Sequence, residues 1–131
     1  MSNGWPIFKD LDGSLIPIEF SPLPFEPKRI FYVVGVPKGE ERGMHAHYQN
    51  KQILTCIQGE ILVKLHDGSI LQQHILRPNE WIFIDSMIWD SQVFLTGKDI
   101  LLSLSSTSYN KEDYIEDFDK FLSIKQKLKY Y

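Results

Sequence analysis

Short apolar or alternating segments, separated by turn-forming residues, make up most of the chain between residues 14 and 105. They are rich in Ile, Val, Phe and Leu, which suit a pleated and partly buried surface, so each is predicted to be a β-strand. Prolines cluster between the segments, where a missing N–H costs no ladder hydrogen bond. The expected strands are residues 14–20, 29–35, 43–48, 52–57, 60–66, 69–76, 81–84, 88–94 and 99–105.

The dipeptide Asp67-Gly68 separates two of these expected strands. It is a strong hairpin signal, because a type I′ turn needs positive φ at both central residues. Many short strands joined by close turns are typical of a β-sandwich, a jelly roll or a small barrel. The pattern therefore predicts an all-β fold with two antiparallel sheets over residues 1–109.

The pattern changes to helical spacing after Tyr109. Asn110 can cap a helix, and the acidic Glu112 and Asp113 suit its first turn. A helical repeat of mostly apolar residues follows, ending in a basic last turn that the helix dipole favours. A C-terminal α-helix is predicted over residues 110–128, packed on the sheets or on a partner.

Size and composition narrow the function without identifying it. With 131 residues and 43% hydrophobic residues, a single domain spanning residues 1–131 is expected. A net charge of −3 without a basic run argues against nucleic acid as a partner. A single cysteine, Cys56, excludes an internal disulfide and is expected to be a buried apolar residue. No signal peptide or membrane segment is expected, so the protein is predicted to be cytoplasmic, without a membrane partner.

The most informative segment is Arg42-Gly43-Met44-His45-Ala46-His47. Residues two apart on a strand share a face, so His45 and His47 should point the same way, and Gln52 on the next strand can face the same pocket. Two neighbouring imidazoles near neutrality suit proton transfer, because one can accept a proton while the other donates one. The plainer alternative is a pair of polar strand residues facing solvent.

A metal site is not expected here. A His-x-His pair followed by an acidic residue and a later histidine is the usual metal set of cupins. In this chain Gln52 stands where the acidic ligand belongs, and residues 88–94 contain no histidine. Two imidazoles and a neutral amide bind a divalent ion poorly, so the predicted metal set is none.

Further pocket residues are suggested by residue type. Tyr32 can stabilise charge on an enolate oxygen, although a core or interface aromatic is nearly as good an interpretation. Arg29 and Arg42 have the forked donors that grip a diphosphate, although a solvated surface charge is at least as good an interpretation of either one. Trp89 can stack on a base or sugar, although a tryptophan in a strand is more often a core residue. The remaining histidines, His66 and His74, flank the expected hairpin and are expected to face solvent.

These residues resemble the dTDP-sugar 3,4-ketoisomerases, small cupins that act on dTDP-4-keto-6-deoxyglucose. The similarity covers nearly the whole chain, and its most specific part is the Arg-Gly-x-His-Ala-His core with Gln52. Weaker matches are the segments 12–19, 28–32 and 38–41 and the tail from Tyr109 to Phe118.

The resemblance implies a jelly-roll homodimer, with exchange of N-terminal strands as an option, and no metal or other cofactor. It implies that a dTDP-linked 4-keto-6-deoxyhexose loses a proton at C3, forms an enediol and gains a proton at C4. His45 and His47 would be the acid/base pair, with His47 favoured as the carbon base and Tyr32 as their pocket partner. Arg29, Arg42, Gln52 and Trp89 would contact the substrate.

Two positions depart from the family pattern. Asp12 stands where the family usually has arginine, and Asp90 stands where it usually has histidine. Because of these two departures, the sequence does not determine which sugar is the substrate or which configuration the product has at C4. Three alternatives also remain: a nucleotide-sugar 3,5-epimerase, a non-catalytic sugar-binding cupin and a metal-dependent cupin enzyme.

Overall fold

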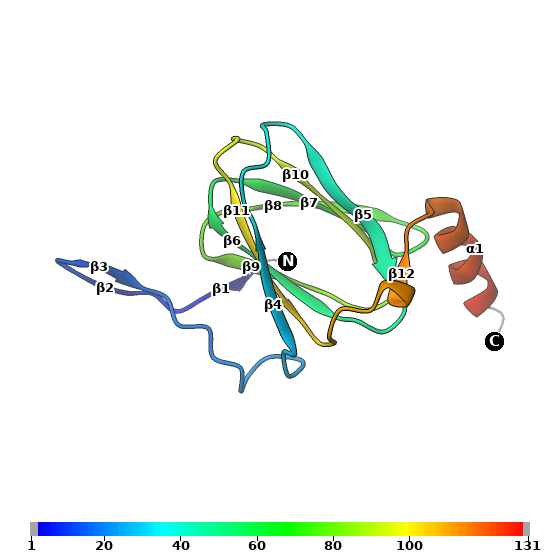
Figure 1. The fold of residues 1–131 in the computed structure, drawn as a ribbon, viewed down its shortest axis with the longest axis horizontal. Coiled ribbons are helices and arrows are strands. Elements are labelled where there is room, and N and C mark those ends of the chain that lie inside the picture. Colours follow the sequence, from blue (N-terminus) through cyan, green and yellow to red (C-terminus); the bar gives the residue numbers. More distant parts are fainter. Residues whose placement is uncertain (1–2, 130–131) are drawn as a thin grey trace.

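The computed structural model describes residues 3–129, which form two antiparallel five-stranded sheets facing each other in a jelly-roll sandwich (Figure 1). The predicted all-β class with a C-terminal helix is confirmed. The first sheet has the order β1 (Asn3–Gly4), β9 (Glu80–Ile84), β6 (Gln52–Gln58), β11 (Ile100–Ser105) and β4 (Arg29–Val33). The second has the order β12 (Tyr114–Ile115), β5 (Glu41–His47), β10 (Trp89–Phe94), β7 (Ile61–His66) and β8 (Leu71–Leu76).

The N-terminal region differs from the expected strand over residues 14–20. A hairpin of β2 (Phe8–Asp10) and β3 (Gly13–Leu15) extends away from the sandwich (Figure 1), and no strand continues past Leu15. Pro17 cannot donate a ladder hydrogen bond, and its neighbours Ile16 and Ile18 pack instead against a cluster that covers the first sheet. Every expected strand from residue 29 onward has a counterpart.

The main core lies between the two sheets. Leu54 and Cys56 from β6 meet Ile61, Val63 and Phe94 of the opposite sheet, and all five side chains are buried. A second apolar cluster covers the outer face of the first sheet, where the Trp5 ring stacks on Trp81 at 5.2 Å. Removing this apolar area from water is the main stabilising contribution to the sandwich.

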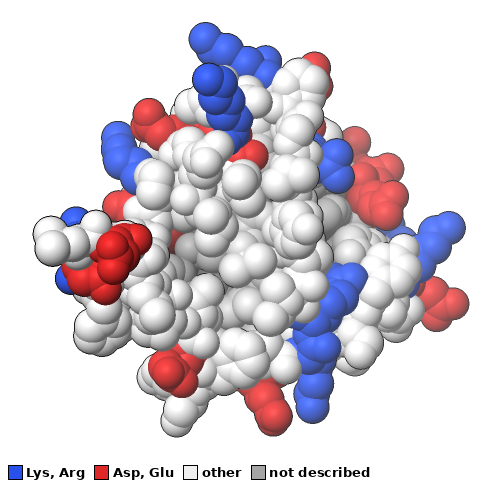
Figure 2. All heavy atoms as spheres, turned by 60° about the vertical axis from the view of Figure 1, so that its left-hand side comes forward, with Lys and Arg blue, Asp and Glu red and all other residues white. Residues whose placement is uncertain are grey.

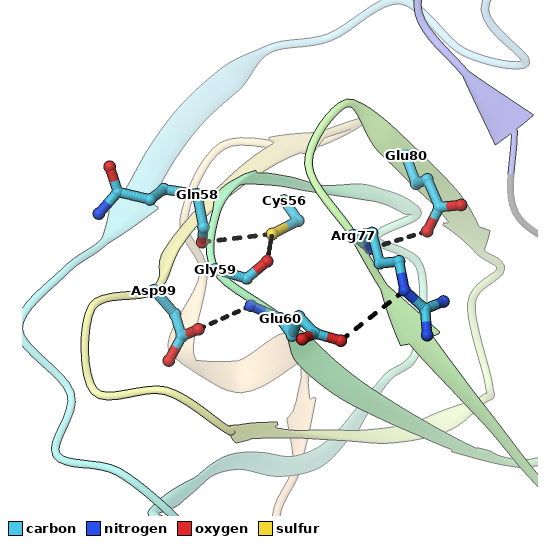
Figure 3. A network of polar contacts seen from close by, with 7 residues as sticks. All are labelled: Cys56, Gln58, Gly59, Glu60, Arg77, Glu80 and Asp99. Carbon is cyan, nitrogen blue, oxygen red and sulfur yellow. Dashed lines mark hydrogen bonds and ion pairs between the residues drawn. The ribbon is translucent and has the colours of Figure 1, made fainter.

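The turn between β6 and β7 is fixed by polar contacts with the segment before β11 (Figure 3). The Asp99 carboxylate accepts a hydrogen bond from the Glu60 N–H at 2.8 Å, and a Cβ on Gly59 would collide with that carboxylate. The Cys56 thiol donates to the carbonyl oxygens of Gln58 and Gly59 at 3.3 and 3.4 Å. Burial, the largest influence, raises the pKa of Cys56 to about 12, so it is a structural thiol, as the sequence predicted.

The hairpin between β7 and β8 forms where Asp67-Gly68 predicted it, with a longer loop than a two-residue turn. The strands end at His66 and resume at Leu71, so residues 67–70 form the loop. The Asp67 carboxylate accepts from the N–H groups of Ser69 and Ile70, both at 2.8 Å. This side-chain bonding replaces the predicted type I′ geometry.

The C-terminal helix is shorter than predicted. Helix α1 (Phe118–Leu128) begins after Asp117, whose side chain caps it, so the prediction of helix over residues 110–117 is wrong. Asn110 instead caps a 3₁₀ turn at Lys111–Asp113, and β12 then pairs with β5. The Asp113 carboxylate accepts from the backbone N–H groups of Gln49 and Asn50, which ties this segment to the sheet. Within residues 3–129 no helix has the length and apolar character to cross a membrane.

Candidate active site

A β-bulge in β5 shapes the site. His45 lies opposite Asp90 on β10, and Gly43 lies opposite the next residue, Ser91, so Met44 is an extra residue in the ladder. Gly43 and Met44 both have positive φ, at 87° and 61°. The extra residue turns Arg42 onto the same face as His45, although simple alternation would place them on opposite faces.

Gly43 leaves no room for a side chain, because a Cβ there would lie 3.0 Å from Gln92 Oε1 and 3.1 Å from Ser91 Cα. Replacing Gly43 by alanine should lower the free energy of unfolding by about 1–3 kcal/mol and lower activity, through strain and displacement of the bulge. Chemical denaturation measures the change. Gly35→Ala is the matched control, because Gly35 also has positive φ but has no atom within 4 Å of the new Cβ. Equal losses in both variants would contradict a role for close packing at the bulge.

A pocket of about 100 Å³ opens between the two sheets beside this bulge. This volume is smaller than the few hundred cubic ångströms that a drug-sized ligand fills, so only part of a large substrate can enter. The half-buried His45 lines the pocket, and the exposed Arg42 stands at its rim. The other lining residues are Phe31, Val33, Gly43, Gln52, Leu54, Asp90, Gln92, Phe94 and Leu101.

The two histidines and Tyr114 form one aromatic group. The ring centroids of His45 and His47 are 4.9 Å apart at 70°, and Tyr114 lies 5.1 Å from His45 and 4.5 Å from His47. Burial lowers the pKa of His45. Burial, with a smaller effect of neighbouring His45, lowers the pKa of His47 to about 4. Both rings are therefore neutral at pH 7 and able to accept a proton.

Asp90 places a carboxyl group beside the histidines. Its side chain is 1% exposed, and its Oδ1 accepts a hydrogen bond from Gln92 Nε2 at 2.7 Å. Burial raises the pKa of Asp90 to about 7, and the bond from Gln92 opposes this shift. Near neutral pH this group is thus present as both carboxylic acid and carboxylate, so it can donate or accept a proton.

Most of the predicted site residues come together. His45, Arg42 and Gln52 line the pocket, and His47 lies behind His45 with 4% exposure. Arg29 is on the inward face of β4 with Phe31, and its positive charge contributes to lowering the pKa of His47.

Two predicted site residues, Tyr32 and Trp89, do not line this pocket. Tyr32 is on the outward face of β4 and is 67% exposed, because the strand alternates and Arg29 and Phe31 take the inward face. Trp89 faces away from the pocket, since its neighbour Asp90 takes the inward position on β10. The Trp89 ring packs instead on the aromatic residues at the start of α1, at 5.2 Å from Phe118.

His66 and His74 were expected to face solvent, but both side chains are half-buried. His66 Nδ1 accepts from the Gly68 N–H, and its ring meets Phe118 at 5.1 Å. The Nε2 atom of His74 is buried without a hydrogen-bond partner among residues 3–129. Neither histidine lines the pocket that contains His45.

Three residues of the site were not assigned to it from the sequence. Asp90 and Gln92 alternate on one strand and therefore share its inward face, which is a signal that the sequence did contain. Tyr114 was expected on a helix, and only the pairing of Tyr114 with His47 across β12 and β5 places it here.

Comparisons with known proteins converge on one family. The family model described as "FdtA: WxcM-like, C-terminal" matches residues 3–126. A TDP-4-oxo-6-deoxy-alpha-D-glucose-3,4-oxoisomerase from Aneurinibacillus thermoaerophilus is 33% identical over 114 residues, covering 86% of this chain and 82% of the relative.

Solved structures agree with this match. A 3,4-ketoisomerase from Helicobacter canadensis superposes with a TM-score of 0.91 at 34% identity, covering 96% of each chain. A histidine-to-asparagine mutant of the 3,4-ketoisomerase QdtA from Thermoanaerobacterium thermosaccharolyticum, in complex with TDP-4-keto-6-deoxyglucose, also has a TM-score of 0.91, at 28% identity over 97% of this chain and 94% of that chain. An RmlC epimerase from Mycobacterium tuberculosis, at 16% identity, shares the fold alone.

Proposed function

We propose that this chain, which belongs to the FdtA-like family of sugar 3,4-ketoisomerases, converts a dTDP-linked 4-keto-6-deoxyhexose into its 3-keto isomer. The observation that carries the proposal is the position of His45: a neutral imidazole in the wall of a small pocket, in edge contact with His47 and Tyr114. Such a group can remove a proton next to a ketone. Incubation with dTDP-4-keto-6-deoxyglucose, coupled to a 3-aminotransferase that traps the product, tests the proposal by NMR.

We assign the carbon base to His45 rather than to His47. His45 lines the pocket, whereas His47 is 4% exposed and does not. In the proposed reaction His45 takes the proton from C3, the electron pair forms the C3–C4 double bond of an enediol, and the C4 oxygen takes a proton. The O3 proton is then lost as C3 becomes the ketone, and C4 receives a proton from the site.

Asp90 and His47 support these steps in different ways. In its acid form Asp90 can donate a hydrogen bond to the oxygen that becomes negative in the enediolate, which stabilises the transition state. His47 and Tyr114 contact the His45 ring edge-on and limit its rotation. A base that is held in position reacts faster than one that must first find its orientation.

We propose that the reaction uses no metal ion and no other cofactor. The hydrogen at C3 lies next to a carbonyl group, and a placed general acid/base contributes roughly 10²- to 10⁴-fold to such a proton transfer. Stabilisation of the enediolate oxygen adds to this. Activity that survives prolonged dialysis against a chelator supports this part of the proposal.

Arg42 and Arg29 are proposed to hold the diphosphate, because a pocket of about 100 Å³ is too small for the whole nucleotide sugar. Replacing Arg42 by glutamine should raise KM for the nucleotide sugar about 10-fold or more with little change in kcat, since a charge-assisted hydrogen bond remote from the reacting carbons is lost. Steady-state kinetics measure both constants. Lys120→Gln, which removes an exposed positive charge from α1, is the control. An unchanged KM for Arg42→Gln would contradict the assignment.

We also propose a homodimer that works in the cytoplasm. The β2–β3 hairpin leaves Phe8, Leu11 and Leu15 exposed, and Ile30 and Tyr32 are exposed on β4. Figure 2, turned toward the side of this hairpin, shows a broad uncharged area with charged side chains mainly around its margin. Exposed apolar side chains, together with few charges, favour association.

The dimer predicts the effect of a charge on the hairpin. Leu11→Asp should shift the protein from dimer toward monomer in sedimentation velocity, because a carboxylate would be buried at the interface. Ile70→Asp, on the exposed β7–β8 loop, should leave the dimer intact. A wild-type protein that sediments as a monomer at tens of micromolar would contradict the proposal.

A further inference from the structure

The acid/base cluster also has the composition of a metal site. One possible ligand atom each from His45, His47 and Asp90 lies within 4.8 Å of the others. His47 Nε2 and Asp90 Oδ2 are buried, and neither has a hydrogen-bond partner among residues 3–129. Buried polar atoms without partners are rare in proteins, and a bound ion is one explanation for them. Two of the three candidate ligands therefore have an atom that an ion could satisfy.

Asp90 supplies a third ligand that the sequence pattern did not include. The prediction that no metal binds rested on His45, His47 and the neutral Gln52, which are too few ligands for a divalent ion. Asp90 adds an anionic oxygen at the position facing His45 across β5 and β10. Two imidazole nitrogens and one carboxylate oxygen are a common donor set for Zn²⁺ and related transition metals, with one coordination position left open.

The donor set also selects among cations. Mg²⁺ and Ca²⁺ prefer six or more oxygen ligands, whereas this cluster offers two nitrogens and one free carboxylate oxygen. The candidate ligand atoms lie within 4.8 Å of one another, so binding of an ion draws the three side chains closer together.

We propose that His45, His47 and Asp90 form a binding site for a divalent transition-metal ion, and that this ion inhibits the isomerase. Inhibition follows because the ion and the substrate proton compete for the same lone pair on His45. The binding claim is independent of the proposed function, and only the inhibition rests on it.

The binding test uses Zn²⁺ and Co²⁺ as probes and needs no sugar. Tag-free protein treated with chelator and then dialysed is titrated with Zn²⁺ by calorimetry, and Co²⁺ is added to follow its visible absorption. We expect one ion per chain and at least about 100-fold weaker binding in Asp90→Asn, since a ligand is lost. His74→Asn, which removes a histidine that does not line this pocket, should bind as the wild type does.

Two results would overturn the site. One is the absence of heat and of a Co²⁺ spectrum at millimolar metal. The other is equal affinity in the wild type and Asp90→Asn, which would place the ion elsewhere. Circular dichroism of Asp90→Asn confirms that the variant is folded, so that weak binding reports on the ligand.

The inhibition test adds Zn²⁺ to the turnover assay. We expect activity to fall as the site fills, with the same midpoint as in the calorimetry, and to return on chelation. Unchanged turnover at saturating Zn²⁺ would overturn the inhibition. Turnover that requires the ion would overturn it too and would also contradict the metal-free reaction, whereas an inactive but metal-binding protein would contradict the proposed function alone.

Discussion

Replacing His45 by asparagine should lower kcat by about 1000-fold or more, with KM for the nucleotide sugar changed only a few-fold. The asparagine amide fills part of the space of the imidazole ring, but it cannot accept a proton near pH 7. Removal of the C3 proton therefore has no general base. The diphosphate contacts remain, which preserves binding. Turnover is measured by the coupled assay, and binding of the sugar by calorimetry.

The matched control is His74→Asn, the same chemical change on β8 outside the pocket, which should keep full activity. Near-normal turnover in His45→Asn would contradict the assignment of the base. If His47→Asn then abolished turnover, the role would belong to His47, as the resemblance first suggested. Loss of activity in both variants fits the proposed pair, because His47 packs against the reacting ring.

Replacing Asp90 by asparagine should stabilise the fold at pH 8 by about 2–4 kcal/mol. Burial raises the pKa of Asp90 from 3.8 to about 7, because the interior disfavours the carboxylate. Between these two pH values the folded chain holds a proton that the unfolded chain has lost, so stability from this group decreases as pH rises from about 4 to about 7. Asparagine is never charged and keeps an oxygen that can accept from Gln92.

The effect of Asp90 is measured as the difference in unfolding free energy between the wild type and Asp90→Asn at each pH. His45 and His47 have lowered pKa values, so their contribution to stability rises with pH over the same range and masks Asp90 in the wild type alone. Urea unfolding in the presence of chelator, at pH 5 and pH 8, should show an advantage of the variant that grows with pH. An advantage that is absent at pH 8, or equal at both pH values, would show that Asp90 is not a buried group of raised pKa.

The fold was predictable where the pattern reports burial directly. Alternation and β-branched residues located the strands from residue 29 onward, since each strand has one face in the core. The region after Tyr109 was less predictable, because its helical spacing competes with long-range contacts. Asp113 bonds to the backbone of Gln49 and Asn50, and those contacts hold residues 114–115 as a strand.

The candidate site was predictable only in part for similar reasons. The His-x-His spacing placed His45 and His47 together, whereas residue type alone put Tyr32 in the pocket and did not show which face of β4 points inward. The bulge at Gly43 depends on the register with β10, which no local pattern specifies. Asp90 was visible as an unusual residue, but its burial and raised pKa arise from packing between two sheets.

Deuterium incorporation during turnover tests the central claim most directly. The chelator-treated protein is incubated with dTDP-4-keto-6-deoxyglucose in deuterated water, and the trapped product is read by NMR. Removal of the C3 proton by His45, followed by protonation of C4 from a site group that has exchanged with solvent, predicts an amino group at C3 of the trapped product and deuterium at C4, with no metal added. Deuterium at C5 with the ketone still at C4, or no reaction until a metal ion is supplied, would contradict it.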